Sequence, residues 1–83
     1  MPRAAKALAE LPLPVQRRVA TRVNELAAAP RGPGVVKLKG SETPPIYRVR
    51  IGRDYRVLFT IDDATRTVAV VTVGPRKDVY RRR

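Results

Sequence analysis

Arginine is the residue type in this sequence that could carry chemistry, together with one tyrosine near the end of the chain. Arg48 and Arg50 alternate with apolar residues, Arg56 follows a Gly-x-Asp-Tyr turn, and Arg76 and Tyr80 lie in a basic C-terminal segment. A guanidinium group binds phosphate through two parallel hydrogen bonds and stabilises charge that spreads over phosphorus. A tyrosine can stack on a base or transfer a proton. These residue types indicate chemistry on a phosphodiester.

The sequence lacks the side chains on which most other reactions depend. It contains no Cys and no His, which excludes thiolate nucleophiles, imidazole catalysis, disulfides and nearly all transition-metal sites. RNA supplies its own nucleophile, the 2′-OH, so a metal-free ribonuclease needs to orient that group and neutralise developing charge. A pure RNA- or DNA-binding module would use the same residues, and composition leaves both open. We expect no cofactor and no metal.

The charge balance indicates an acidic partner. Eighteen Lys and Arg against seven Asp and Glu give a formal net charge of +11 in 83 residues, more than solubility requires. No window approaches the roughly 20 apolar residues of a membrane span, and the first residues do not resemble a signal peptide. We therefore expect a single domain over residues 1–83, located in the cytoplasm and without membrane contact.

Apolar residues at helical spacing predict an N-terminal helical hairpin over residues 2–29. Pro12-Leu13-Pro14 separates its two helices, because proline has no N–H and pushes the preceding residue out of the helical region. The second helix carries an apolar stripe that we expect to be core. This stripe consists of Val15, Val19, Val23 and Leu26.

From residue 46 the apolar period changes to two, which predicts three antiparallel strands over residues 46–73. Residues 35–39 lie between two clusters of Gly and Pro and are expected to form a connection at most. The predicted fold class is α+β, with the helical hairpin packed on one face of a small three-stranded sheet. The opposite face is expected to be open and basic, and residues 76–83 form a basic C-terminal tail.

The turn at residues 52–54 sets a register that brings like charges together on the open face. If Ile51 pairs with Tyr55, Arg50 falls opposite Arg56, and Arg48 lies on the same face. Opposed like charges destabilise a sheet by a few tenths to about 1 kcal/mol, so the arrangement indicates a bound anion. The alternative interpretation is that solvent-exposed arginines only protect the strands from aggregation.

Several segments together resemble the RelE/ParE superfamily of type II toxins. They are Lys37-Leu38-Lys39-Gly40, residues 47–52, residues 54–59 and residues 73–81, and the helical hairpin agrees with them, so the resemblance covers nearly the whole chain. For the RelE branch it implies an mRNA endonuclease, a hydrolase that cuts in the ribosomal decoding site by 2′-OH attack and inhibits translation. It also implies a cognate antitoxin, acidic and partly disordered when free, through which the toxin oligomerises.

The resemblance implies roles for particular residues of this sequence. The catalytic set consists of Arg48, Arg50, Arg56, Arg76 and Tyr80. The residues expected to bind RNA are Lys37, Lys39, Arg53, Lys77 and Arg81. The family commonly has lysine at the first two catalytic positions and a basic residue or histidine where Pro75 stands, so groups suited to proton transfer are missing here.

Two alternatives to a ribosome-dependent endonuclease stay open. One is a ParE-like toxin that inhibits DNA gyrase, and the other is a catalytically inactive remnant that binds antitoxin. The family's first edge strand has no counterpart in this sequence, so we expect a bare sheet edge, or one completed by the antitoxin or by a second copy.

Overall fold

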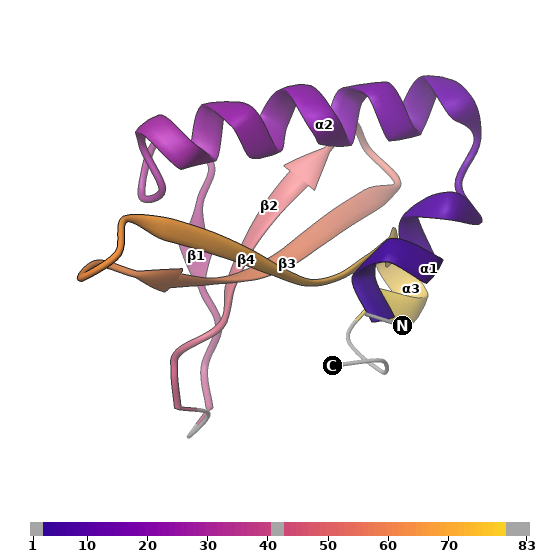
Figure 1. Ribbon diagram of the computed structural model, residues 1–83. Helices are drawn as coiled ribbons and strands as arrows, with labels where there is room; N and C mark the ends of the chain where they lie inside the picture. Colours follow the sequence, from indigo (N-terminus) through magenta and orange to yellow (C-terminus); the bar gives the residue numbers. More distant parts are fainter. Residues whose placement is uncertain (1–2, 41–42, 80–83) are drawn as a thin grey trace.

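A four-stranded antiparallel sheet lies at the centre of the protein, whose computed structural model describes residues 3–40 and 43–79 (Figure 1). Its strand order is β1-β2-β3-β4. The strands are β1 (Val36–Lys37), β2 (Tyr47–Ile51), β3 (Tyr55–Asp62) and β4 (Thr67–Pro75). The predicted α+β class is confirmed, but the predicted strand number was one too low. Val36 and Lys37 pair with β2, and a strand of two residues is too short to show an alternating pattern.

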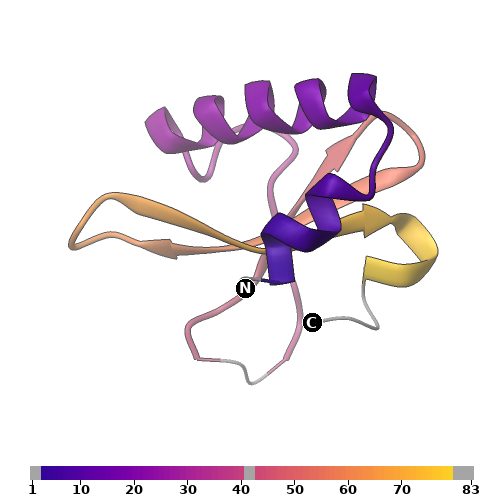
Figure 2. The ribbon, with the colours of Figure 1, turned by 45° about the vertical axis from the view of Figure 1, so that its right-hand side comes forward.

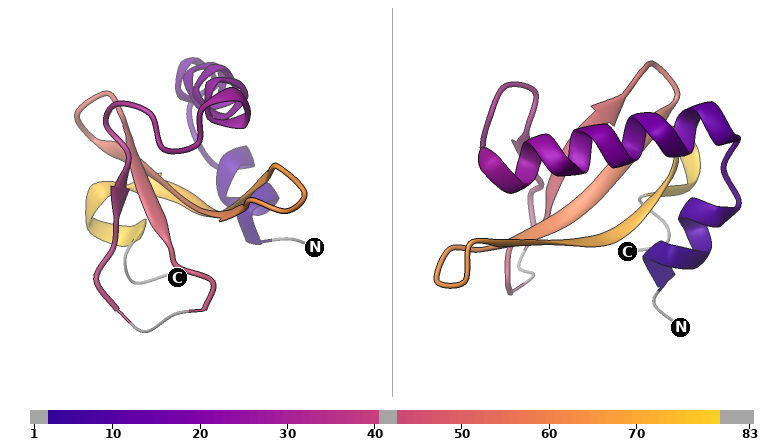
Figure 3. Two further views of the ribbon diagram at one scale, coloured as in Figure 1. Left: turned by 90° about the vertical axis from the view of Figure 1, so that its left-hand side faces the viewer. Right: turned by 45° about the horizontal axis from the view of Figure 1, so that its top comes forward.

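The helices α1 (Arg3–Ala9) and α2 (Leu13–Ala28) lie together on one face of the sheet (Figure 3). Pro12 stands at the N-cap of α2 with φ −55° and ψ 145°, so the chain leaves the helical region between the two helices. The side-chain amide of Gln16 donates a hydrogen bond of 2.9 Å to the carbonyl oxygen of Leu11, which ties α2 to the end of α1. Among the described residues, no helix is long and apolar enough to cross a membrane.

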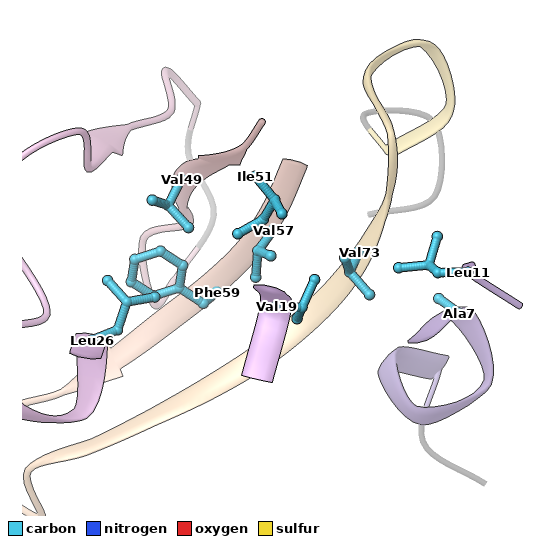
Figure 4. Close-up of a cluster of buried hydrophobic side chains, with 9 residues drawn as sticks. All are labelled: Ala7, Leu11, Val19, Leu26, Val49, Ile51, Val57, Phe59 and Val73. Atoms are coloured by element: carbon cyan, nitrogen blue, oxygen red, sulfur yellow. The ribbon is translucent and has the colours of Figure 1, made fainter. Parts of the chain in front are cut away.

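The main core fills the space between these helices and the sheet (Figure 4). Its buried members are Ala7, Leu11, Val19, Leu26, Val49, Ile51, Val57, Phe59 and Val73. The stripe predicted on the second helix is confirmed as core, because Val19 and Leu26 are buried and Val15 and Val23 pack against them.

A bulge interrupts the pairing of β3 with β4. Leu58 pairs with Thr72, but Phe59 pairs with Val70, so Val71 is an extra residue in β4. Val70 packs against the main core, whereas Val71 packs against a second cluster on the other face. The strand therefore supplies apolar side chains to both faces, which explains its nearly continuous apolar sequence.

A short helix, α3 (Arg76–Val79), packs on the sheet face opposite the main core (Figure 3). It closes a second hydrophobic cluster formed by Ile46, Leu58 and Val79, with Leu38 and Val71 packed against it. The prediction of a fully open face is therefore wrong. Leu58 stands on this face, and burying its side chain and that of Val79 stabilises the contact by about 1.5 to 3 kcal/mol each.

Candidate functional site

Three of the predicted catalytic residues, Arg50, Arg56 and Arg76, belong to the end of the sheet where β2 turns into β3 and where β4 leads into α3 (Figure 2). Ile51 pairs with Tyr55, as predicted, and encloses a three-residue turn. Gly52 in this turn has φ +64°, a conformation that favours glycine. The backbone N–H of Arg76 donates a hydrogen bond of 2.7 Å to the carbonyl oxygen of Asp54. This bond fixes the start of α3 beside the turn.

The register of the sheet confirms the predicted opposition of two arginines. Arg50 lies opposite Arg56, and Arg48 lies opposite Leu58. On the other side of β3, Gly74 lies opposite Arg56. Apart from its chain neighbours, no atom of the described residues lies within 4 Å of a Cβ atom added at Gly74, which is itself buried. Arg56 is therefore the middle residue of a row across three strands, and no side chain stands opposite it on β4.

Arg56 is buried, which contradicts the prediction that it faces solvent. Its relative exposure is only 3%. The Nη1 atom donates hydrogen bonds to the carbonyl oxygens of Arg53 at 3.1 Å and of Tyr55 at 3.0 Å. The Nε atom is buried without a hydrogen-bond partner in the described part of the chain, and the ion pairs found there involve other arginines. Arg56 is therefore a buried cation held by carbonyl dipoles, an arrangement that costs free energy.

The other predicted catalytic arginines differ in their surroundings. Arg76 is exposed, as predicted, at the first position of α3, and Arg48 is half-buried on β2. Arg50 is exposed and lines a cleft beside α2. Arg50 and Arg56 stand on one sheet face, as predicted, but the expectation that this face is open is wrong at Arg56, which is buried. Tyr80 lies outside the described residues.

Thr72 is a polar residue near the site that the sequence interpretation did not single out. It is fully buried, and its pairing with Leu58 places it on the same sheet face as Arg56. Its hydroxyl has no hydrogen-bond partner within residues 3–40 and 43–79. Buried polar groups without a partner are rare and are typical of places where a ligand, ion or water binds. Thr72 is the only polar residue of the run 68–73, which is the sequence signal that could have identified it.

The residues predicted to bind RNA are divided by the fold. Arg53 is exposed in the turn before β3, and Lys77 is exposed on α3, so both lie near the start of α3. Lys37 pairs with Tyr47, whose ring packs against the main core, which places Lys37 on the helix side of the sheet. The structure does not bring Lys37 together with Arg56.

Two further basic residues belong to the set predicted to bind RNA. Lys39 is exposed in the loop that follows β1. Arg81 lies outside the described residues. Only part of the set predicted to bind RNA is therefore found at the end of the sheet that carries the site.

Another arginine forms an ion pair that lies apart from this site. The guanidinium nitrogens of Arg31 lie 2.8 Å and 3.1 Å from the two carboxylate oxygens of Asp63. The same guanidinium stands 5.5 Å from the centre of the Tyr47 ring. Its hydrogen bond to Asp63 holds the pKa of that carboxyl below its usual value. The pair connects the loop after α2 to the β3–β4 turn and is structural.

Solved structures with the same fold are toxins bound to antitoxins. A chain of the toxin–antitoxin complex RelBE2 from Mycobacterium tuberculosis shares 27% identity, with a TM-score of 0.77 over 92% of this chain and 91% of that chain. A chain of the RelB–RelE antitoxin–toxin complex from Methanococcus jannaschii shares 22% identity, with a TM-score of 0.71 over 94% of this chain and 89% of that chain. No curated protein matches the sequence.

The fold and the family match identify the chain as a toxin of a type II toxin–antitoxin system. Residues 1–80 match the family model for the ParE toxin of the type II toxin–antitoxin system parDE. The chain belongs to this family, within the RelE/ParE superfamily. The resemblance inferred from the sequence motifs is confirmed at the level of the superfamily.

Proposed function

We propose that this toxin is a ribosome-dependent mRNA endonuclease that cuts in the decoding site and inhibits translation in the cytoplasm. The observation that carries the proposal is the buried Arg56 guanidinium, which has no side chain opposite it on β4, where Gly74 leaves room for a Cβ atom. A protein of 83 residues has little stability to lose, and a cation buried without a carboxylate partner lowers it. Such a residue is explained by a function that needs a fixed positive charge.

The proposed reaction uses the nucleophile of the RNA itself. The 2′-oxygen gives its proton to a water molecule and bonds to the adjacent phosphorus, and the bond from phosphorus to the 5′-oxygen breaks. The products are a 2′,3′-cyclic phosphate and a 5′-hydroxyl, the latter formed when the leaving oxygen takes up a proton. Arg56 and Arg76 neutralise the charge that develops on the phosphate oxygens. A guanidinium hardly acts as a base, so the arginines contribute charge stabilisation and positioning rather than proton removal.

The described residues favour one direction of approach for the substrate. α3 covers the sheet at Leu58, whereas the position opposite Arg56 on β4 is a buried glycine with room for a Cβ atom among the described residues. The scissile phosphate therefore approaches Arg56 over Gly74, between the turn 52–54 and the exposed Arg76. Arg48 holds the neighbouring part of the RNA backbone, and Tyr80 stacks on a base or donates the proton to the leaving oxygen.

A cognate antitoxin is the second partner in this proposal. The two solved structures described above are toxin–antitoxin complexes. A net charge of +11 favours an acidic segment that is partly disordered when free and folds when it binds. Antitoxin binding neutralises the basic sheet end and provides the route to oligomers.

One observation favours a second candidate function, inhibition of DNA gyrase. The family model that matches the chain is that of the ParE toxin, and the ParE branch acts on gyrase. The different exposure of the two opposed arginines, with Arg56 buried and Arg50 exposed beside α2, also departs from a uniform surface of RNA-cutting residues. This candidate predicts growth arrest without cleavage of mRNA.

A primer-extension map of 5′ ends on a translated mRNA tests the proposal directly. Purified toxin is added to programmed ribosomes, to the same RNA without ribosomes, and in parallel to a gyrase supercoiling reaction. We expect cuts within the decoding-site codon that require the ribosome and that Arg76→Ala abolishes. Arg66→Ala is the matched control, because Arg66 is also an exposed arginine but lies in the β3–β4 turn at the other end of the sheet. Absence of cuts with inhibited supercoiling would establish the gyrase function, and absence of both would indicate an inactive antitoxin-binding remnant.

A further inference from the structure

A second group of arginines lies where α2 passes the end of β2. Arg17, Arg18 and Arg22 of α2 and Arg50 of β2 line a cleft of about 350 Å³. The cleft contains one carboxylate, that of Glu25. Four arginines and one glutamate give the cleft a net charge of +3. We call this group the α2 arginine cleft.

The cleft is built by elements that are far apart in the sequence. Arg18 extends from α2 toward the β2–β3 turn, where its Nη1 atom lies 3.5 Å from the position that a Cβ atom on Gly52 would take. On the outer side of β2, β1 pairs only with Tyr47 and Arg48. Within the described ranges, no strand covers β2 at Arg50, so the cleft opens along this edge of the sheet.

The cations of the cleft are only partly compensated within the protein. Arg22 binds Glu25 at 3.3 Å and donates a 2.6 Å hydrogen bond to the carbonyl oxygen of Pro33, so it holds the loop that follows α2. Arg17, Arg18 and Arg50 form no ion pair or side-chain hydrogen bond within residues 3–40 and 43–79. Three positive side chains from two elements therefore converge on one cleft without counter-charges of their own.

The need to keep the protein soluble does not explain why these arginines converge on one cleft. Exposed arginines on a helix are common and keep a protein soluble. Arg18 and Arg22, however, stand four residues apart on α2, a spacing at which like charges destabilise a helix. Arg50 adds a further cation from the sheet side. Convergence of this kind favours an anionic ligand.

The lining of the cleft indicates which anion fits. Ile51 is the only large apolar residue of the lining, and it is 5% exposed, so the cleft offers no apolar anchor. Protein partners draw most of their binding energy from a few anchors, enriched in Trp, Tyr and Arg, that fill well-packed and fully desolvated pockets, whereas Arg17, Arg18 and Arg50 are exposed. A nucleic-acid backbone instead binds through its charge, and arginine matches the geometry of phosphate. We propose that the α2 arginine cleft binds the phosphate backbone of a nucleic acid, at a site separate from the cleavage site around Arg56.

This inference goes beyond the proposed reaction and does not rest on it. An RNA backbone is the ligand if the toxin acts on the ribosome, and a DNA backbone is the ligand if it acts on gyrase. Binding is measured with the toxin alone, in the absence of ribosome and gyrase. Failure of the cleavage proposal therefore leaves the binding measurement interpretable, and failure of the binding measurement leaves cleavage untouched.

The test is the salt dependence of binding of the intact toxin to a fluorescein-labelled single-stranded RNA and to a labelled DNA duplex. The variant Arg17→Gln/Arg18→Gln removes two charges from the cleft. Its matched control is Lys6→Gln/Arg66→Gln, which removes two exposed charges from α1 and from the β3–β4 turn. Circular dichroism confirms that both variants are folded.

We expect the cleft variant to bind RNA on the order of 10-fold more weakly at 0.1 M salt. The slope of log K against log salt should become shallower by about 1.4, because each lost contact to a single strand removes about 0.7. Preferential weakening of RNA or of DNA identifies which backbone the cleft takes, and either result supports the proposal. The control variant should change both quantities much less.

Three results would overturn the proposal. Equal weakening by the cleft variant and by the control would show that only overall charge matters. Unchanged affinity for both nucleic acids would show that the cleft binds neither. A poly-glutamate peptide is titrated in parallel as a probe for an acidic protein segment. Weaker binding of this peptide to the cleft variant, with unchanged nucleic-acid affinity, would assign the cleft to such a segment instead.

Discussion

Replacement of the buried Arg56 by methionine separates the effect of the guanidinium on the free energy of unfolding from its effect on mRNA cleavage. Methionine retains an unbranched apolar side chain that can occupy much of the same space. It removes a guanidinium that is 3% exposed and that donates to the carbonyl oxygens of Arg53 and Tyr55. We expect Arg56→Met to abolish mRNA cleavage while leaving the protein folded.

The expected change in the free energy of unfolding is small because two large effects oppose each other. Two hydrogen bonds from a charged donor contribute about 1.5 to 3 kcal/mol each, and Arg56→Met removes both. Relief of the desolvation of an ion offsets this loss by several kcal/mol, because the described residues place no carboxylate beside the guanidinium. The net change should therefore lie within about 2 kcal/mol of zero.

Urea unfolding followed by circular dichroism measures this change, and Arg56→Lys is the informative companion variant. Lysine keeps the charge but is more strongly hydrated and cannot donate in the guanidinium geometry, so the lysine variant should be less stable than the methionine variant. A methionine variant that is destabilised by more than about 3 kcal/mol would refute the reasoning. The same holds if lysine proves more stable than methionine, because buried charge would then not be the dominant cost.

Four other variants test the proposed site, the second hydrophobic cluster and the ion pair of Asp63. Arg76→Ala should lower ribosome-dependent cleavage by about 100-fold or more in primer extension, with unfolding changed by less than about 0.5 kcal/mol because the side chain is exposed. Gly74→Ala should leave stability unchanged or raise it by up to about 1 kcal/mol in urea titrations, yet reduce cleavage, because the new methyl group enters the free space beside Arg56. Leu58→Ala should cost about 2 to 5 kcal/mol in the same titrations, since Leu58 is fully buried in the second cluster. Asp63 has a lowered pKa in the folded protein, so its contribution is present above the usual carboxyl range and is lost as the pH falls below about 4. Thermal melts from about pH 5 to about pH 2 should therefore lose less stability in Asp63→Asn than in the unchanged protein; equal losses would contradict the ion pair.

The helical hairpin and the strand register could be predicted from the sequence because short-range rules determine them. Pro12 interrupts the helices, and the three-residue turn after Ile51 fixes the pairing of Arg50 with Arg56. Both features depend on residues that are close together in the chain. Apolar periodicity also identified Val19 and Leu26 as core. They lie on the one apolar face of α2, and this face packs against the sheet.

The surroundings of the site residues could not be predicted in the same way. Arg56 is buried on the sheet face that also carries Leu58, and Leu58 is covered by α3 through Val79, more than 20 residues later in the chain. The α2 arginine cleft depends on Arg18 extending to the turn at Gly52, a contact between distant elements that no periodicity encodes. Register predicts which residues share a face, but it does not predict which of them another element covers.

The bulge at Val71 determines more than the packing of β4. Each residue of a strand reverses the side to which the next side chain points, so one extra residue changes the phase of everything that follows. Deletion of Val71 would turn Val73 away from the main core, or else pull the end of the strand out of its pairing. The start of α3 would then leave the sheet on a different side, and Arg76 would move with it. One unpaired valine therefore couples the packing of the core to the position of a residue proposed to touch the substrate, so random deletions in this strand should abolish folding and toxicity together.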